Sequence, residues 1–144
     1  MSDRKRIFVR EVMKTEFDVV DGLNTITQAL ATMKHHETKC LIVRKRHEHD
    51  EWGMLLLSDI ARTVLARDLS PDRVNVYEVM AKPVLSVRPD MDIRYCARLF
   101  NRFNVSRAPV VEGDAVVGIV SFTDLVLKGL CREAPGDGIE VEPL

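Results

Sequence analysis

Ser121, Thr123 and Asp124 place two hydroxyl groups and a carboxylate where the apolar run 118–120 ends and a helical pattern begins. A carboxylate at such a junction can accept hydrogen bonds from both hydroxyl groups of a ribose, as the acid of dinucleotide-binding folds does. The free N–H groups at the start of a helix also favour a nearby phosphate. A structural interpretation stays open, because Thr123 and Asp124 also suit the cap of a helix.

Other side chains offer contacts for the remaining parts of such a ligand. Arg107 and Lys82 are candidates for contact with phosphate groups, which guanidinium and ammonium groups bind well. Apolar groups at Val84, Ala108 and Pro109 can sandwich a flat base. Together with Ser121, Thr123 and Asp124, these residues form the second candidate site.

A first candidate site lies earlier in the chain and is less complete. Asp59 follows Ser58 in a similar position, but Leu56 stands where the later segment has Ser121. With one hydroxyl missing, three interpretations stay open: a different ligand, weak binding, or a capped helix without a ligand. The Phe17 ring offers a stacking surface for a base. The candidate contacts of this first site are Asp59, Ser58, Thr15, Phe17, Lys39, Cys40 and Arg62.

The two sites belong to two copies of one repeat. The segment 9–13 recurs as 76–80, at an offset of 67 positions. Beyond the second strand of each copy the offset falls to 65, because Gly53 aligns with Gly118, and the two-residue insertion fits a solvated turn within 44–51. The offset of 67 also relates two apolar helical stripes, Ile26, Ala29, Leu30 and Met33 to Ile93, Cys96, Ala97 and Phe100.

Each copy has the pattern of a β-α-β-β-α unit, which predicts the α/β (α+β) class. Candidate helix caps are Asn24 or Thr25 in the first copy and Asp90 or Asp92 in the second. Because one copy cannot cover both faces of a three-stranded sheet, we expect the two copies to pack together with pseudo-two-fold symmetry. The predicted strands are 17–20, 40–44, 53–57, 84–87, 108–111 and 115–120, and the predicted helices are 25–36, 58–66, 92–103 and 123–130.

The predicted organisation therefore has five parts. They are an N-terminal extension 1–8, repeat one 9–67, a linker 68–75, repeat two 76–130 and a mobile C-terminal tail 131–144.

Charge and cysteine content limit the function classes. With 21 basic and 22 acidic residues and a net charge of -1, no overall field favours nucleic acid or an anionic membrane. Cys40, Cys96 and Cys131 are an odd set without C-x-x-C spacing, which argues against a disulfide framework and a zinc site. No apolar run resembles a signal peptide or a membrane span. We therefore expect a cytoplasmic protein without nucleic-acid or membrane partners.

Several groups with possible chemistry have simpler interpretations. The segment 47–51 contains potential metal ligands, but alternating charges at a hairpin tip are usually a solvated turn, so no metal site is predicted. His35 and His36 end a helix, where cations complement the helix dipole; a contact with phosphate is the alternative. No nucleophile with an adjacent base, Walker loop or carboxylate pair is found, which favours a protein that is not an enzyme.

Three motifs resemble the cystathionine β-synthase (CBS) domain in its tandem form, the Bateman module. They are the V-x-E-V-M starts, the segment 106–111 before a Gly-Asp hairpin, and the segment 118–125, which resembles the family signature G-h-h-S/T-x-x-D with h apolar. The resemblance covers residues 9–130 and is that of a stand-alone CBS domain-containing protein.

The resemblance implies a regulatory sensor for signal transduction that binds an adenosine-containing ligand in the cleft between the repeats. The candidates are AMP, ADP, ATP, NAD and S-adenosylmethionine. An adenine nucleotide would be a regulatory ligand and not a catalytic cofactor, and we expect the second site to be the functional one. The resemblance also implies a homodimer, parallel or antiparallel, and a regulated partner protein of unknown identity. The alternative is a ligand-independent structural or dimerisation scaffold for a partner.

Overall fold

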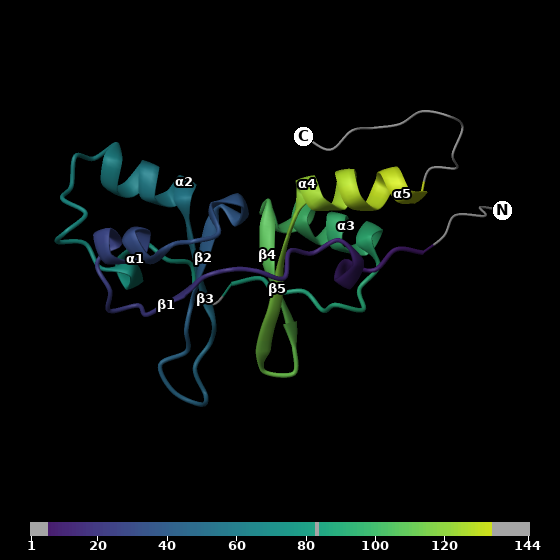
Figure 1. Ribbon diagram of the computed structural model, residues 1–144, viewed down its shortest axis with the longest axis horizontal. Coiled ribbons are helices and arrows are strands. Elements are labelled where there is room, and N and C mark those ends of the chain that lie inside the picture. The colour runs from purple at the N-terminus through teal and green to yellow at the C-terminus, as the bar shows by residue number, and fades with distance from the viewer. Residues whose placement is uncertain (1–5, 83, 134–144) are drawn as a thin grey trace. The chain divides into compact units, whose positions relative to one another are not determined.

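The computed structural model describes residues 6–82 and 84–133 of the chain (Figure 1). The contacts divide the chain into two units, which cross the boundaries of the sequence repeats. Residues 16–85 form one unit, here called the first-copy unit, because it contains most of repeat one. Residues 1–15 and 86–144 belong to the other, here called the second-copy unit.

The first-copy unit is built on a three-stranded sheet. Its strands are β1 (Val19–Val20), β2 (Cys40–Val43) and β3 (Gly53–Leu56), in the order β1-β2-β3. The pair β1/β2 is parallel and the pair β2/β3 is antiparallel. A parallel pair needs a crossover connection, and α1 (Ile26–Thr32) lies in it. The 3₁₀ turns are η2 (His36–Thr38) and η4 (Val76–Glu78), and α2 (Leu57–Ile60) continues into the π-helical segment η3 (Ala61–Leu65).

The second-copy unit repeats this plan with longer strands. The helix α3 (Ile93–Phe103) leads to the antiparallel strands β4 (Arg107–Glu112) and β5 (Ala115–Ser121). The closing helix consists of α4 (Phe122–Asp124), the π-helical segment η5 (Leu125–Leu130) and α5 (Cys131–Glu133). It runs past the predicted end at residue 130, and residues 134–144 of the predicted tail lie outside the described residues. The 3₁₀ turn η1 (Val9–Glu11) completes this unit.

The strand pairing has the same register in both units. Val20 pairs with Val43 in parallel, and Val87 pairs with Val110 in the same way. On the far side of each antiparallel pair, Ala81 bridges Met54 and Lys14 bridges Ile119. These pairs are related by the offsets of 67 and 65 that the sequence shows. The α+β class and the internal repetition are therefore confirmed.

The first turn of each repeat packs in the unit of the other repeat. In η1, the N–H of Val9 donates to the carbonyl of Met91 at 2.8 Å. In η4, the N–H of Val76 donates to the carbonyl of Asn24 at 2.8 Å. The ranges 9–67 and 76–130 thus describe the repeat in sequence, whereas each spatial unit contains one segment from the other copy.

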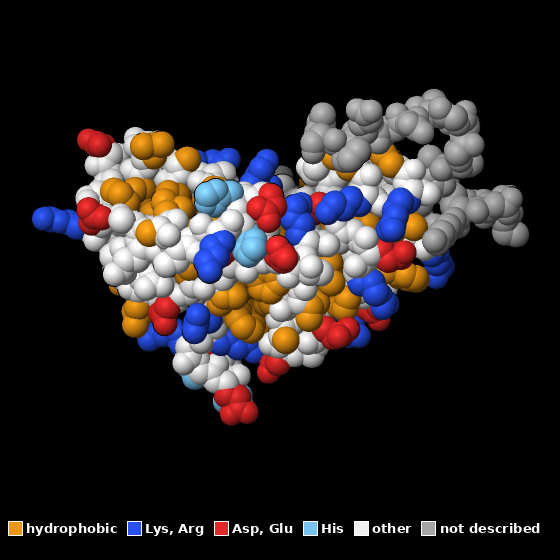
Figure 2. Space-filling model, in the orientation of Figure 1, with side chains coloured by type: hydrophobic (Ala, Val, Ile, Leu, Met, Phe, Trp, Pro, Cys, Tyr) orange, Lys and Arg blue, Asp and Glu red, His pale blue; other side chains and the backbone are white. Residues whose placement is uncertain are grey.

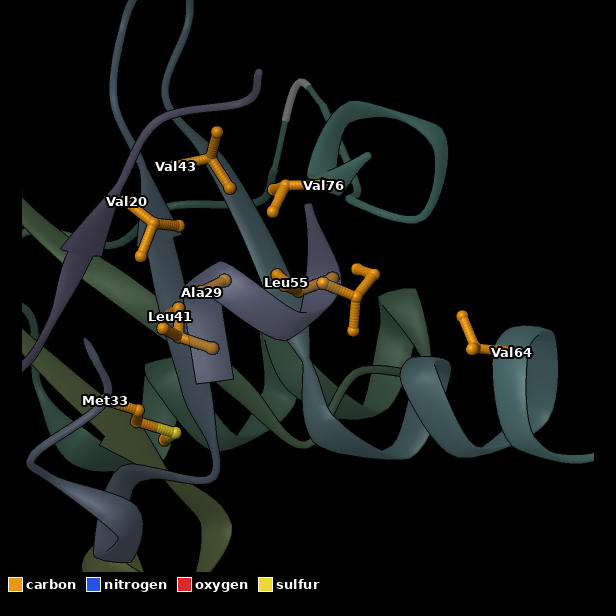
Figure 3. Close-up of a cluster of buried hydrophobic side chains, with 9 residues drawn as sticks. Val20, Ala29, Met33, Leu41, Val43, Leu55, Val64 and Val76 are labelled. Atoms are coloured by element: carbon orange, nitrogen blue, oxygen red, sulfur yellow. The ribbon is translucent and has the colours of Figure 1, made fainter. Parts of the chain in front are cut away.

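The core of the first-copy unit lies between its helices and its sheet. Figure 3 shows Val20, Leu41 and Leu55 from the strands close to Ala29 of α1. Val76 of η4 belongs to the same cluster and is completely buried. The exchanged turn is therefore part of the core of this unit.

Helix α1 ends at Thr32, although the apolar pattern predicts a helix to residue 36. The carboxylate of Asp18 accepts hydrogen bonds from the N–H groups of Lys34 and His35, at 3.1 and 2.9 Å. This tertiary contact replaces the last helical turn, and the sequence pattern carries no sign of it. Of the two candidate caps predicted for each helix, Thr25 caps α1 and Asp92 caps α3.

Candidate functional site

Asp124 lies at the junction of β5 and α4 and is 2% exposed. Its Oδ2 accepts hydrogen bonds from the N–H of Ser121 at 3.1 Å and from its hydroxyl at 3.0 Å. In return, Ser121 Oγ accepts the N–H of Asp124 at 3.2 Å, which completes a capping box. A helix cap is thus present, but it differs from the one that the sequence suggested: Ser121 occupies the cap position, Asp124 is the third residue of the helix, and Thr123 is not the cap residue. Thr123 lies beside Asp124 and is exposed.

Two lysines neutralise the buried carboxylate. Lys14 Nζ lies 2.6 Å from Asp124 Oδ1, and Lys128 Nζ lies 3.5 Å from the same oxygen. Lys14 is held in place because its backbone exchanges two hydrogen bonds with Ile119 of β5. The sequence pattern did not predict a role for Lys14. The difference between the two copies could have indicated one, because Lys14 directly follows V-x-E-V-M in the first copy, where the second copy has Ala81.

The strand β4 brings other predicted residues to this junction. Arg107 is the register partner of Ser121, and the carbonyl of Ser106 accepts the N–H of Phe122 at 2.9 Å. Ala108 and Pro109 are buried in the same strand. The structure therefore brings Arg107, Ala108, Pro109, Ser121, Thr123 and Asp124 together in one unit.

The other two residues predicted for the second site lie in the first-copy unit. Val84 is half-buried there, and Lys82 forms an ion pair with Asp50. The Lys82 ammonium group donates a hydrogen bond to Asp50, and the backbone N–H of Arg46 donates another. Together these two bonds hold the pKa of the Asp50 carboxyl well below its usual range. The sequence pattern did not predict Asp50 as the partner of Lys82.

The first candidate site has the same backbone plan but a more open acid. The carbonyl of Lys39 accepts the N–H of Leu57 at 3.1 Å, and Cys40 is paired with Leu56 in the sheet. Leu56 occupies the cap position and supplies no side-chain cap. The Asp59 side chain is 33% exposed and contacts Arg62, with 3.3 Å between its Oδ1 and Nη1.

Most residues predicted for the first site share one unit. Phe17 is half-buried, Ser58 is exposed, and both lie in the first-copy unit with Lys39, Cys40, Asp59 and Arg62. Thr15 belongs to the second-copy unit.

The two junctions therefore differ in how firmly the acid is held. Asp124 is buried, capped and neutralised by lysine, whereas Asp59 is half-exposed beside one arginine. A fixed carboxylate next to a helix start can orient a polar ligand, and the paired cations can meet an anionic group.

The thiol of Cys96 is buried and unreactive. Burial raises the pKa of the Cys96 thiol to about 12, so it stays protonated at neutral pH. In residues 6–82 and 84–133, no cluster of three or more His, Cys, Asp or Glu side chains is arranged to hold a metal ion. No helix in these ranges combines the length and the apolar character needed to span a membrane.

The sequence is similar to known proteins along most of its length. The family profile of the CBS domain matches residues 76–129. The CBS domain-containing protein YhcV of Bacillus subtilis (strain 168) is 28% identical over 131 residues, which are 91% of this chain and 91% of that protein.

Solved structures extend this likeness to the fold. The hexameric CBS-CP12 protein from bloom-forming cyanobacteria is 35% identical, with a TM-score of 0.83, over 92% of this chain and 76% of that chain. The CBS domain pair of protein MJ0100, in complex with 5′-methylthioadenosine and S-adenosyl-L-methionine, is 23% identical with a TM-score of 0.70, over 85% of this chain and 94% of that chain. The latter likeness shows the shared fold alone. Because identity of 35% to the cyanobacterial protein extends over most of both chains, this chain belongs to the CBS-domain family.

Proposed function

We propose that this CBS-domain protein is a regulatory module that binds an adenosine-containing ligand: AMP, ADP, ATP, NAD or S-adenosylmethionine. The observation that carries the proposal is the strand–helix junction with an acid, Asp59 or Asp124, built twice at equivalent positions. The ligand acts as a regulator and not as a catalytic cofactor, and it signals by changing how the repeats or two protomers pack. A ligand can shift such an equilibrium only by its different affinity for the two states.

The second-copy junction is our preferred site, because its acid is pre-organised. Ser121 holds Oδ2 of the Asp124 carboxylate before any ligand arrives, so binding costs less conformational entropy. The hydroxyl groups of a ribose would take the positions on Oδ1 that Lys14 and Lys128 now use. The displaced ammonium groups would then be free to pair with a phosphate of the ligand.

Isothermal titration of nucleotide-stripped protein with the five candidate ligands tests this proposal. The informative variant is Asp124→Asn, because Asp124→Ala would also delete the capping-box acceptor that holds the start of the closing helix. We expect Asp124→Asn to lose binding and the matched variant Asp59→Asn to retain it. Thermal unfolding of both variants serves as the control for the fold.

Each other outcome has a defined meaning. Loss of binding in Asp59→Asn alone would move the site to the first-copy junction. Undiminished binding in both variants would overturn the assignment to these two junctions. If the parent protein binds none of the five ligands, the regulatory proposal fails and a scaffold function takes its place.

The scaffold alternative is supported by an apolar groove on the first-copy unit. A groove of about 360 Å³ runs along α1, α2 and η3, and Leu30 and Leu65 in its lining are 39% and 77% exposed. Figure 2 shows hydrophobic side chains at the surface over α1 and α2. Exposed apolar patches of this kind mark interaction surfaces. The alternative function is a ligand-independent dimerisation scaffold for a partner protein.

The alternative predicts self-association through this groove. We expect the parent protein to form a homodimer whose mass, measured by light scattering, does not change with nucleotide. Leu65→Glu should yield monomers, and Leu23→Glu should not, although Leu23 is 67% exposed, because it does not line the groove. A parent dimer that changes its assembly when nucleotide is added would favour the regulatory proposal instead.

The proposal also includes a setting for the protein. With a net charge of -1, the chain lacks the field that attracts nucleic acids or anionic membranes, so we propose that it has no such partners. We also propose a cytoplasmic protein without enzymatic turnover, because the odd set of cysteines fits a reducing compartment and the sequence carries no catalytic motif. The identity of a regulated partner protein is open to co-purification experiments.

A further inference from the structure

A cavity of about 650 Å³ lies in the first-copy unit, at the end of the sheet opposite the Asp59 junction. The junction adjoins the start of β2, where Cys40 pairs with Leu56. The cavity adjoins the end of β2, where Val43 pairs with Gly53. It is therefore distinct from both candidate sites described above.

The cavity is lined by an excess of cations. Arg44, Lys45, Arg46 and Lys82 line it together with a single acid, Asp21. Figure 2 shows Lys and Arg side chains gathered at the base of the β2–β3 hairpin, above its acidic and histidine-bearing tip. Such a concentration of positive charge attracts small anions.

Two of these cations are engaged and two are available. Lys82 pairs with Asp50, and Lys45 Nζ lies 5.7 Å from the centre of the Trp52 ring. Within the described part of the chain, the exposed side chains of Arg44 and Arg46 have no acidic partner. Two guanidinium groups are thus left to bind an anion, and their planar fork suits a phosphate.

Part of the cavity wall is apolar. Tyr77 and Met80 line it, and the Tyr77 side chain is 52% exposed although it is aromatic. An exposed ring that lines the same cavity as Arg44 and Arg46 offers a stacking surface for a flat group attached to the phosphate.

The equivalent hollow in the second-copy unit lacks this charge. It measures about 410 Å³, and the offset of 67 places Val111, Glu112 and Gly113 in its lining where the first copy has Arg44, Lys45 and Arg46. Its Arg88 pairs with its own Asp90 at 3.2 Å. The hollow is therefore a property of the repeated fold, whereas its positive charge is specific to the first copy.

From these observations we infer that the first-copy cavity is a further ligand site that binds a small phosphorylated molecule with a flat ring. Arg44 and Arg46 bind the phosphate, and Tyr77 contacts the ring. The Lys82–Asp50 ion pair holds the hairpin against the segment after η4 and so keeps the cavity open. The inference does not depend on the proposed function, because neither Asp59 nor Asp124 lines the cavity.

The test is a titration of the full chain with phenyl phosphate, followed by ¹H–¹⁵N correlation spectra. We expect saturable shifts at Gly22, Arg46 and Tyr77, and tighter binding of phenyl phosphate than of inorganic phosphate. Arg44→Gln/Arg46→Gln should raise the dissociation constant by about tenfold or more, because both charge-assisted contacts are lost.

The repeat supplies a matched control, Arg10→Gln/Arg88→Gln in the second-copy hollow, which should leave binding unchanged. An equal loss of binding in both double variants would overturn the inference, because it would mean attraction by net charge alone. Undiminished binding in Arg44→Gln/Arg46→Gln would overturn it as well. Asp59→Asn/Asp124→Asn should retain phenyl phosphate binding, which separates this result from the fate of the proposed nucleotide sites.

Discussion

The ion pair of Lys14 and Asp124 is the contact that most distinguishes the two junctions at the scale of single residues. The side chain of Asp124 is 3% exposed and that of Lys14 is 23% exposed. A carboxylate at that depth is stable in its charged form only when a cation and hydrogen-bond donors surround it. The first-copy unit has Ala81 in the equivalent position and leaves Asp59 closer to solvent.

Replacement of Lys14 tests how much this ion pair contributes to the free energy of unfolding. We expect Lys14→Met to lower the free energy of unfolding by about 2 kcal/mol, because the buried carboxylate loses its nearest cation while Lys128 compensates in part. The measurement is urea unfolding followed by circular dichroism. Lys128→Met is the control and should cost less than about 1 kcal/mol, since Lys128 is half-exposed. Equal effects of the two variants would contradict the assignment of Lys14 as the main cation that stabilises Asp124.

The pair of Lys82 and Asp50 gives a prediction for acid pH. The pKa of Asp50 lies well below the ordinary value of 3.8, chiefly because Lys82 donates a hydrogen bond to its charged form. A group with a lowered pKa in the folded state stabilises the fold fully above its unfolded pKa, and this contribution is lost as the pH falls below that value. The parent should therefore exceed Asp50→Asn in melting temperature near neutral pH, and the difference should shrink between about pH 4 and about pH 2. Calorimetry across this range measures it, and a constant difference would refute the ion-pair explanation.

At the scale of elements, the strand β5 and the segment that carries Lys14 approach closely at a glycine. A Cβ on Gly118 would lie 2.7 Å from the carbonyl oxygen of Lys14 and 2.7 Å from the sulfur of Met13. At the equivalent Gly53, the nearest atoms would be 3.1 Å or more away. The pairing of Lys14 with β5 therefore requires a glycine at position 118. The equivalent pairing of Ala81 with β3 depends less on the glycine at position 53.

This difference predicts unequal effects of one substitution. Gly118→Ala should lower the free energy of unfolding by about 3 kcal/mol, because backbone must move to admit the methyl group, whereas Gly53→Ala should cost about 1 kcal/mol. Chemical denaturation of both variants provides the comparison. A larger effect at Gly53 would show that the close approach is not the controlling contact.

The elements also show what sequence patterns can and cannot predict. The offsets of 67 and 65 predicted the equivalence of the strands, because a repeat in sequence must repeat its pairing register. They could not predict where α1 ends, since the contact of Asp18 with Lys34 joins residues 16 positions apart. The role of Lys14 was hidden for the same reason, because its partner Asp124 is 110 positions away.

At the scale of the whole molecule, each unit is completed by a segment of the other repeat. Similarity between the copies cannot reveal this exchange, because it shows which residues correspond and not which residues touch. Val76 lies 67 positions after Val9 but is buried in the core of the first-copy unit. The boundaries of a folding unit therefore differ from those of the repeat.

Fragments of the chain test this difference. We expect the peptide of residues 16–85 to unfold cooperatively on heating, because it contains the whole first-copy unit, including Val76. The peptide of residues 9–67 follows the repeat but lacks η4, so we expect a weaker or non-cooperative transition. Circular dichroism at increasing temperature distinguishes them. A more stable 9–67 peptide would show that the exchanged turn contributes little to the core.

The exchange of the first turns also sets an order of events during synthesis of the chain. The first-copy unit is one continuous stretch, so all of its residues are available once position 85 has left the ribosome. The second-copy unit joins residues 1–15 to residues 86–144. Ile7 and Val9, which are buried in the finished protein, must therefore wait for residues 91–93, with which their backbones form hydrogen bonds, and the buried Val12 must wait for the closing helix. During that interval the apolar side chains of Ile7, Val9 and Val12 have no core to enter and are open to chaperones or to the same segment of another nascent copy.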